Sequence, residues 1–585
     1  MRYLGRKLSK NLPFFVAMAV CSICSVLAML SLPNCLSIVI NQGINEAING
    51  NKQLGESIIL SQSGQMFLWT ILSMAAGICS GYFCSKGMAK TTISIRREVF
   101  GKIQYFSPAE FDKFSTASLI TRTSNDVTQI QNFTFSALMI AIMAPLMLIG
   151  GLFMSLTKSA QLSMVLLVLI PLIALAVGLI SYFAIPLSTS MQSKQDKLNL
   201  VLREKLTGIR VTRAFGTEDY ERERFLNADK DFMQTSLKLQ RLLALLAPLL
   251  MFLVNMSTIA LLIIGGSSVE IATKAGDLIA VIQYIAMIAI AIMAVCIVLS
   301  ILPRAASAIR RVSQVINTDI SIKDLEDQEK PTKIKGTVEF KDVSFRYPGA
   351  DKDALEHISF KVEPGKTMAI IGGTGSGKST ILNLIPRFYD VTEGEVLVDG
   401  VNVKNMKLKK LRSLIGYALQ KAFLFSGTIN SNIEFGSCEE LSDDQIKKAA
   451  KVSQSLEFIE AKDEKFDAPI SRAGSNVSGG QRQRLSIARS IASEPEVYLF
   501  DDSFSALDFK TDAKLRADLL LITKKAAVII VAQRISTIIN SDNILVIDKG
   551  KCVGQGTHDE LLETCPTYKE IYDSQISEED LAHGK

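Results

Sequence analysis

Residues 372–380 have a pattern typical of loops that bind nucleotide phosphates. The residues Gly372, Gly373, Thr374, Gly375, Ser376, Gly377, Lys378, Ser379 and Thr380 fit GxxxxGK[ST], between a strand-like run at 367–371 and a helical run from Ile381. Glycines let backbone N–H groups turn toward phosphate oxygens, and the start of the helix favours negative charge. In this setting Lys378 reaches the β and γ phosphates and Ser379 holds Mg²⁺. The pattern favours a nucleoside triphosphate site over a chance glycine-rich turn.

A carboxylate ends a second apolar run. Val497–Phe500 has the composition of a buried strand, and Asp501 follows it directly. Nucleotide hydrolases with this kind of loop place a Mg²⁺-organising carboxylate at such a strand end. An aspartate there is often only a solvated strand end, but together with the loop it supports ATP and Mg²⁺ as ligands.

Long apolar runs dominate the chain before Pro303. Six are long enough to cross a bilayer, which takes about 20 helical residues. We place them at 14–40, 66–84, 135–156, 162–187, 242–265 and 278–302, and none contains Asp, Glu, Lys or Arg. A signal peptide is the alternative for the first run, but the run is too long and lacks a small-residue cleavage site.

Lysine and arginine are spread unevenly between these runs. Segments 85–134 and 188–241 carry seven and eleven of them, whereas the three other connections hold only Lys52, Lys158 and Lys274. Cytoplasmic loops are enriched in these residues, so both long segments and both termini are expected in the cytoplasm. Helical spacing of apolar residues predicts that the membrane helices extend into these segments and turn near Pro108 and at 216–219. Solvated charged helices remain the alternative.

Composition limits the remaining choices. The 585 residues are 48% hydrophobic and carry a formal net charge of only +6, which argues against disorder and gives no sign of nucleic-acid binding. The nine cysteines lack the spacing of a disulfide scaffold or a zinc site. Beyond residue 317, a polar stretch at 318–335 separates the membrane half from a charged domain at 336–585 with short β-rich runs. The fold class is thus a six-helix transmembrane domain followed by an α/β nucleotide-binding domain.

Further motifs give the chain a resemblance to ATP-binding cassette (ABC) exporters. Residues Ser478, Gly479, Gly480 and Gln481 resemble the signature motif of that family, upstream of Asp501. The resemblance implies that Tyr347 stacks on adenine, that Gln420 joins Ser379 and Asp501 around Mg²⁺, and that Ser505, Ala506, Leu507 and Asp508 form the D-loop. It extends from the N-terminal stretch to Gly556–His558.

The resemblance implies that two such chains, each with six spans and one cassette, form a dimer. Each ATP then lies between one chain's phosphate loop and the other chain's signature motif. Coupling helices are expected near 107–118 and 216–225. ATP biases such a cycle only to the extent that it binds the closed state better than the open one.

Two residues depart from the family's pattern. Asp502 stands where hydrolysing members have Glu, and Gln533 stands where they have His. Asp is one methylene shorter and would hold its oxygens further from the attacking water, while Gln carries no positive charge. We expect these residues to make a slow catalytic site, although normal turnover is the alternative. Ser471 and Arg472 also replace the usual Gly and Glu before the signature motif.

The departures resemble the degenerate subunit of bacterial heterodimeric multidrug exporters. We therefore expect a bacterial plasma-membrane protein that exports hydrophobic or amphipathic small molecules with a second, different half-transporter. The lipids around it and an uncharged cargo would be its other partners, since no span carries a charge. A lipid flippase and a mainly regulatory ATP-binding subunit are the alternatives.

Overall fold

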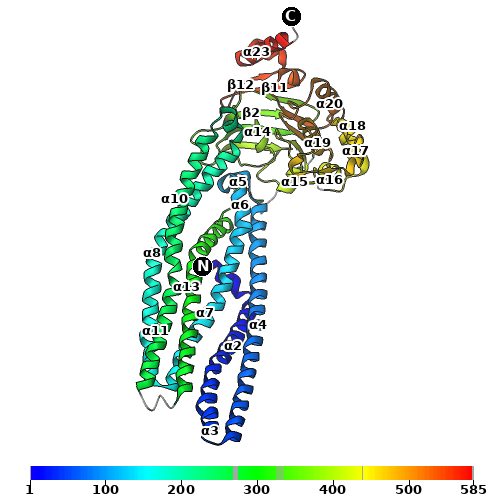
Figure 1. The fold of residues 1–585 in the computed structure, drawn as a ribbon. Coiled ribbons are helices and arrows are strands. Elements are labelled where there is room, and N and C mark those ends of the chain that lie inside the picture. The colour runs from blue at the N-terminus through cyan, green and yellow to red at the C-terminus, as the bar shows by residue number, and fades with distance from the viewer. Residues whose placement is uncertain are drawn as a thin grey trace. The chain divides into compact units, whose positions relative to one another are not determined.

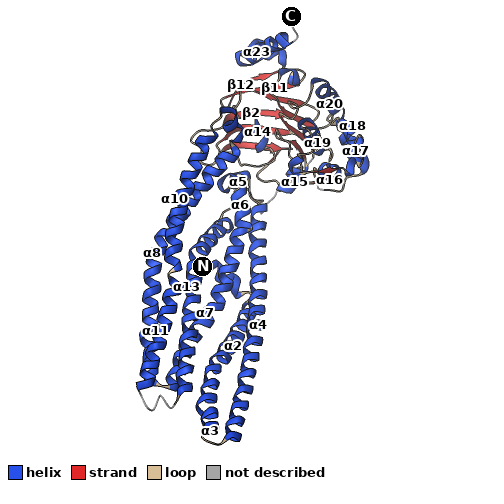
Figure 2. Ribbon diagram, viewed as in Figure 1, coloured by secondary structure: helices blue, strands red, loops and turns tan. Residues whose placement is uncertain are grey.

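The computed structural model describes residues 2–267, 274–325, 329, 331, 334–437 and 439–582. The chain forms two compact units (Figure 1). Unit 1 comprises Met1–Ile103 and Ala117–Thr318, and unit 2 comprises Gln104–Thr116 and Asp319–Lys585. In the described residues of unit 1 every regular element is a helix, and all strands belong to unit 2 (Figure 2).

Six helical segments of the described chain are long and apolar enough to cross a membrane. The helices are α1 (Arg2–Ser9), α2 (Leu12–Ile38), η1 (Val39–Ile44), α3 (Asn45–Ile48), α4 (Lys52–Gln104), α6 (Thr116–Thr123), α7 (Asn125–Lys158), α8 (Ala160–Thr207), α9 (Ile209–Phe215), α10 (Glu218–Ala244), α11 (Leu246–Ser267) and α13 (Ala275–Asn317). Each predicted span falls on one of the six segments, so the six-helix prediction is confirmed.

The helices differ from the prediction in their ends. The predicted span 242–265 crosses a break at Leu245, between α10 and α11. The short helix in the second basic segment is α9 (Ile209–Phe215), so its predicted position at 216–225 is wrong. Gly216 has a left-handed backbone with φ of 62° and ends α9, which is what a glycine after a helix commonly does. Residues 218–225 instead begin the long helix α10.

An ion pair with a buried carboxylate joins two helices of unit 1. Asp126, in the first turn of α7, is fully buried, and its Oδ2 accepts a 2.7 Å hydrogen bond from Nε of Arg311 on α13. A second guanidinium nitrogen of Arg311 contacts the other carboxylate oxygen. Arg311 also donates to Ser307 Oγ at 2.9 Å. The positive charge of Arg311 thereby compensates the negative charge of Asp126, which is shielded from water.

Unit 2 is built on two main sheets. Its strands are β1 (Val338–Phe345), β2 (Leu355–Val362), β3 (Thr367–Ile371), β4 (Glu393–Val398), β5 (Val401–Asn402), β6 (Ile415–Ala418), β7 (Gly427–Thr428), β8 (Pro469–Ile470), β9 (Val497–Asp501), β10 (Ala527–Val531), β11 (Asn543–Asp548) and β12 (Lys551–Gly556). One sheet has the order β2-β1-β4-β5 and is antiparallel. The other has the order β12-β11-β3-β10-β9-β6, and only β12 is antiparallel to its neighbour.

Helices pack on the strands of unit 2, among them α14 on β9 and β10 and α19 on β6. The helices of this unit are α5 (Pro108–Phe114), α14 (Lys378–Leu384), α15 (Leu408–Ser413), α16 (Ile429–Glu434), α17 (Asp443–Val452), α18 (Leu456–Glu460), η2 (Lys465–Asp467), η3 (Arg472–Gly474), α19 (Gly479–Ile491), α20 (Phe509–Ile522), α21 (Ile535–Ile538), α22 (His558–Thr564) and α23 (Pro566–Ala582). Every residue of β9 and β10 is buried, as expected of parallel strands covered on both faces. This core fixes the strand ends from which the site loops emerge.

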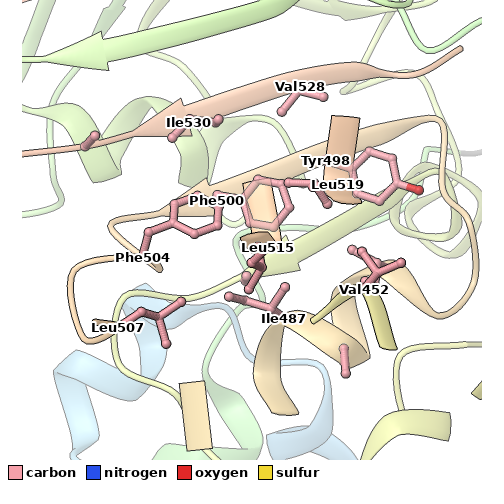
Figure 3. Packing of buried hydrophobic residues seen from close by; sticks show 14 of the residues in the cluster. Val452, Ile487, Tyr498, Phe500, Phe504, Leu507, Leu515, Leu519, Val528 and Ile530 are labelled. Atoms are coloured by element: carbon pink, nitrogen blue, oxygen red, sulfur yellow. The ribbon is translucent and has the colours of Figure 1, made fainter. Parts of the chain in front are cut away.

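The core beside β9 is rich in aromatic rings. Phe500 on β9 lies 5.2 Å from Phe504 and 6.3 Å from Tyr498, measured between ring centroids. Figure 3 shows these rings packed with Leu515 and Leu519 of α20. The packing anchors the carboxyl end of β9, where Asp501 and Asp502 lie.

Helix α5 belongs to unit 2 although its sequence lies between membrane helices. Ser107 and Glu110 form a capping box at its start, and Glu110 is buried. Glu110 Oε1 accepts a 3.0 Å hydrogen bond from the backbone N–H of Ser321, which follows the last membrane helix. The two segments that enter unit 2 from the membrane helices are thus joined to each other.

Candidate nucleotide-binding site

The predicted phosphate loop connects β3 to α14. Gly375 and Gly377 have φ of 79° and 105°, which favours glycine, and a Cβ on Gly372 would collide with the carbonyl oxygen of Ile547. Lys378 Nζ donates to the carbonyl oxygens of Gly372 and Gly373 at 2.8 and 2.7 Å. The loop therefore folds around the Lys378 amine, which also lines the cavity described below.

The loop also offers hydrogen-bond donors to an anion. The Ser376 hydroxyl is buried without a hydrogen-bond partner among the described residues. It lies just before the start of α14, where backbone N–H groups face outward from the helix. A buried hydroxyl without a partner is costly, so a phosphate oxygen here would satisfy it. The loop fits the phosphates of a nucleotide.

A set of hard oxygen ligands lies next to the loop. Ser379 Oγ donates to Asp501 Oδ1 at 2.9 Å, which joins the start of α14 to the end of β9. Gln420, after β6, lies near the same carboxylates and donates to Asp502 Oδ2 at 3.4 Å. Hydroxyl, amide and carboxylate oxygens are the ligands that Mg²⁺ prefers. The three predicted metal ligands therefore fit Mg²⁺.

Most of the predicted nucleotide residues line one cavity of about 540 Å³. They are Tyr347, Thr374, Gly375, Ser376, Gly377, Lys378, Ser379, Thr380, Gln420, Asp501, Asp502 and Gln533. Gly372 and Gly373 do not line it, but their carbonyl groups hold Lys378. Asp353, Ala354, Lys549 and Gly550 also line the cavity and were missed by the sequence analysis. The turn signal of Lys549–Gly550 after an apolar strand is the clue that could have pointed to that loop.

Tyr347 is placed at the mouth of the loop. Its hydroxyl and the Thr380 hydroxyl share a 2.9 Å hydrogen bond. Its ring meets that of Tyr389 edge-on, with centroids 5.3 Å apart. These contacts hold a half-buried aromatic ring against the cavity, which is the placement that stacking on a base needs.

The two departing residues contact each other. Gln533 Nε2 donates a 2.8 Å hydrogen bond to Asp502 Oδ2. Asp502 has a left-handed backbone, with φ of 46°, and its N–H donates to the carbonyl oxygen of Val531 at 2.9 Å. Gln420 and Gln533 therefore both donate to the same carboxylate oxygen of Asp502.

The site changes the pKa of its charged groups. Burial raises the pKa of Asp501, and the neighbouring Asp502 adds to this, while the Ser379 hydrogen bond opposes it. Burial likewise raises the pKa of Asp502 against the hydrogen bond from Gln420. Burial lowers the pKa of Lys378, against the attraction of the two carboxylates. Each shift disfavours the charged form, so a bound ion of opposite sign would restore it.

The signature residues and the four D-loop residues lie outside the cavity. Ser478 caps α19 by accepting from the Gln481 N–H at 3.2 Å, and the Ser478 N–H donates back to Gln481 Oε1. Gly479 and Gly480 form the first turn, and Gly480 lies near the carbonyl oxygen of Ala506. In the D-loop, Ser505 Oγ donates to the Asp502 carbonyl oxygen, Leu507 is buried and Asp508 caps α20.

Comparisons with known proteins match both halves of the chain to known families. Residues 15–293 match the family described as the ABC transporter transmembrane region, and residues 355–505 match the ABC transporter family. An uncharacterized ABC transporter ATP-binding protein of Mycobacterium tuberculosis is 37% identical over 556 residues, 94% of each chain. An uncharacterized ABC transporter ATP-binding protein of Bacillus subtilis, YfiB, is 36% identical over 90% of this chain and 93% of its own.

Two further comparisons concern lipid transport and fold. An ATP-dependent lipid A-core flippase of Mannheimia succiniciproducens is 33% identical over 88% of this chain and 87% of its own. The structure of a bacterial Atm1-family ABC exporter with ATP bound superposes with a TM-score of 0.80, at 23% identity, over 97% of this chain and 98% of that one. At that identity the structural match concerns the fold. The chain therefore belongs to the ABC transporter family, with an exporter-type transmembrane domain followed by an ABC nucleotide-binding domain.

Proposed function

We propose that the chain is one half of a heterodimeric exporter that uses ATP to move hydrophobic or amphipathic small molecules. Its own nucleotide site binds Mg²⁺ and ATP but hydrolyses ATP slowly. Its signature motif, residues 478–481, completes a competent site on a different partner subunit. In this proposal the domains divide at 317 and 336, and both termini and the nucleotide-binding domain lie in the cytoplasm of a bacterial cell.

The observation that supports the slow site most strongly is the contact between Asp502 and Gln533. A general base must come within about 2.6–3.2 Å of the proton that it takes. Asp502 has a short side chain, and its Oδ2 already accepts from Gln533 at 2.8 Å. The short side chain would hold the carboxylate further from an attacking water, and the hydrogen bond from Gln533 stabilises the charged carboxylate, which makes it a weaker base.

Roles follow for the remaining residues. Lys378 and the loop glycines bind the phosphates, while Tyr347 stacks on the base. Ser379, Gln420 and Asp501 would hold Mg²⁺, which supplies charge neutralisation between phosphate oxygens when bound. Residues 505–508 would meet the partner's nucleotide site beside the signature motif.

Lipid flipping is the second candidate for the transported substrate. The supporting observation is the 33% identity to a protein named as a lipid A-core flippase, over most of both chains. Fluorescent lipids and hydrophobic dyes in separate vesicle assays distinguish the two cargo classes. Accumulation of dye without lipid movement supports small-molecule export, and the reverse supports a flippase.

The test of the proposal is ATP binding and ATP turnover of this chain purified alone in lipid, and then with the half-transporter encoded beside it. Binding without turnover until the partner is added is the expected result. Fast turnover by the chain alone would overturn the heterodimer. A purely regulatory role predicts that Lys378→Ala weakens assembly of the two chains but leaves transport by the assembled complex intact.

A further inference from the structure

The loop that carries Gln533 is hydrogen-bonded to α23, the last helix that the structure describes. This switch loop, residues 532–534, connects β10 to α21. Gln575 on α23 (Figure 1) donates from Nε2 to the Gln533 carbonyl oxygen at 2.7 Å. Its Oε1 accepts from the Ile535 backbone N–H at 2.8 Å. One side-chain amide thus spans the loop and bonds the backbone on both sides of Arg534.

Helix α23, which carries that amide, is anchored to the rest of unit 2 by buried side chains. Tyr568 is fully buried near the start of the helix, and its hydroxyl shares a 2.7 Å hydrogen bond with Nδ1 of His558. Ile571 and Tyr572 pack against the hydrophobic core beside β9 and β10. Gln575 follows one turn later, so its backbone is anchored within reach of the loop.

A second clamp holds α21, the helix that follows the loop. Arg516 on α20 donates from one nitrogen to the carbonyl oxygens of Ser536 and Thr537, at 3.0 and 3.3 Å. Asp512 orients it by accepting from Arg516 at 2.8 and 3.1 Å. With the backbone held on this side, the Gln533 side chain lines the nucleotide cavity and contacts Asp502.

We propose that Gln575 is a positioning residue that holds Gln533 toward the terminal phosphate and so sets this site's preference for ATP over ADP. The inference rests on the proposed function, in which the cavity binds ATP. An amide N–H reaching an anionic phosphate oxygen makes a charge-assisted hydrogen bond that depends steeply on distance. ADP lacks that phosphate, so displacement of the loop weakens ATP binding and leaves ADP binding unchanged.

The test measures ATP and ADP affinities of the full chain in lipid, with Mg²⁺. Gln575→Ala is expected to reduce the ratio of ATP to ADP affinity by about 5- to 20-fold, with the ADP affinity unchanged. Gln575→Glu keeps the acceptor for the Ile535 N–H but loses the donor to the Gln533 carbonyl, so an intermediate loss is expected. Glu570→Gln, an exposed change on the same helix, is the matched control.

A double variant tests whether Gln575 acts on ATP binding through Gln533. Gln533→Ala should lower the same ratio, and Gln575→Ala added to it should cause no further loss. If Gln575→Ala has a normal ratio of ATP to ADP affinity and Gln533→Ala has a reduced one, Gln533 contacts the phosphate but Gln575 does not position it. Additive losses also overturn the positioning role, because Gln575 would then act independently. A normal ratio in Gln533→Ala, with ATP still bound, would show that Gln533 does not contact the terminal phosphate and would overturn this inference while leaving ATP binding by the site in place.

Discussion

At the residue scale, Asp502 and Gln533 determine how fast the site can hydrolyse ATP. Asp502→Glu with Gln533→His should raise ATP turnover of the chain alone, by up to the 10²–10⁴-fold that a positioned base contributes. The added methylene moves the carboxylate toward the attacking water, and His removes the amide that now donates to it. Steady-state phosphate release measures the effect. The exposed change Asp463→Glu adds the same methylene elsewhere, and equal turnover in the two proteins would contradict the assignment.

The raised pKa of Asp501 predicts a pH effect on the metal. A metal ligand must be ionised, and burial makes Asp501 take up a proton at a higher pH than the usual value near 4. Lowering the pH from about 7.5 to about 5 should therefore weaken the Mg²⁺-dependent part of ATP binding. Asp501→Asn should remove that part at both pH values, whereas Asp463→Asn should not. An Mg²⁺ effect that is equal at the two pH values would contradict the prediction.

Several site residues could be predicted because a local pattern defines them. The phosphate loop has a fixed spacing, and Asp501 ends an obvious apolar strand. Gln575 has no such signal, since it acts on a loop 42 residues away through backbone groups that any sequence has. Asp353 and Lys549 come from turns whose position depends on how the two sheets pair. These contacts depend on tertiary structure, which a single sequence does not specify.

At the element scale, hydropathy located the six membrane helices but not their ends. Apolar runs stop where the bilayer stops, whereas α4 continues to Gln104 because charged and small polar residues also form helices. The predicted break at 216–219 is confirmed, but the second short helix was misplaced because it was expected after this break, whereas α9 lies before it. In the structure Gly216 is the residue that ends α9, and the acidic residues 218, 219 and 221 begin α10, where a helix start favours negative charge.

The Asp126–Arg311 pair predicts a single change that weakens the contact between α7 and α13. Arg311→Ala leaves a fully buried carboxylate without its partner and should lower the free energy of unfolding by about 2–4 kcal/mol. Arg310→Ala, one residue earlier and exposed, is the matched control. Thermal unfolding in detergent compares the two variants. Equal melting temperatures would show that water or another cation compensates Asp126.

At the scale of the whole molecule, the proposal predicts that the phosphate loop and the signature motif of this chain act on different ATP molecules. Lys378 acts on this chain's own slow site, whereas Ser478 acts on the partner's competent site. In the assembled heterodimer, changing the signature motif of this chain should therefore abolish most ATP turnover. Changing its phosphate loop should leave a substantial part. A homodimer has no such asymmetry, because each change would be present at both sites.

Ser478 also caps α19, so the variants must separate folding from chemistry. Ser478→Ala loses the cap, which costs about 1 kcal/mol, whereas Ser478→Asn keeps a good cap but replaces the hydroxyl that would meet the partner's nucleotide. Both variants should reduce turnover of the heterodimer at least about tenfold, the effect of losing one charge-assisted hydrogen bond in the transition state. Ser475→Ala, an exposed serine just before the motif, should not. Turnover that falls with Lys378→Ala and survives Ser478→Asn would reverse the assignment, because hydrolysis would then take place at this chain's own site.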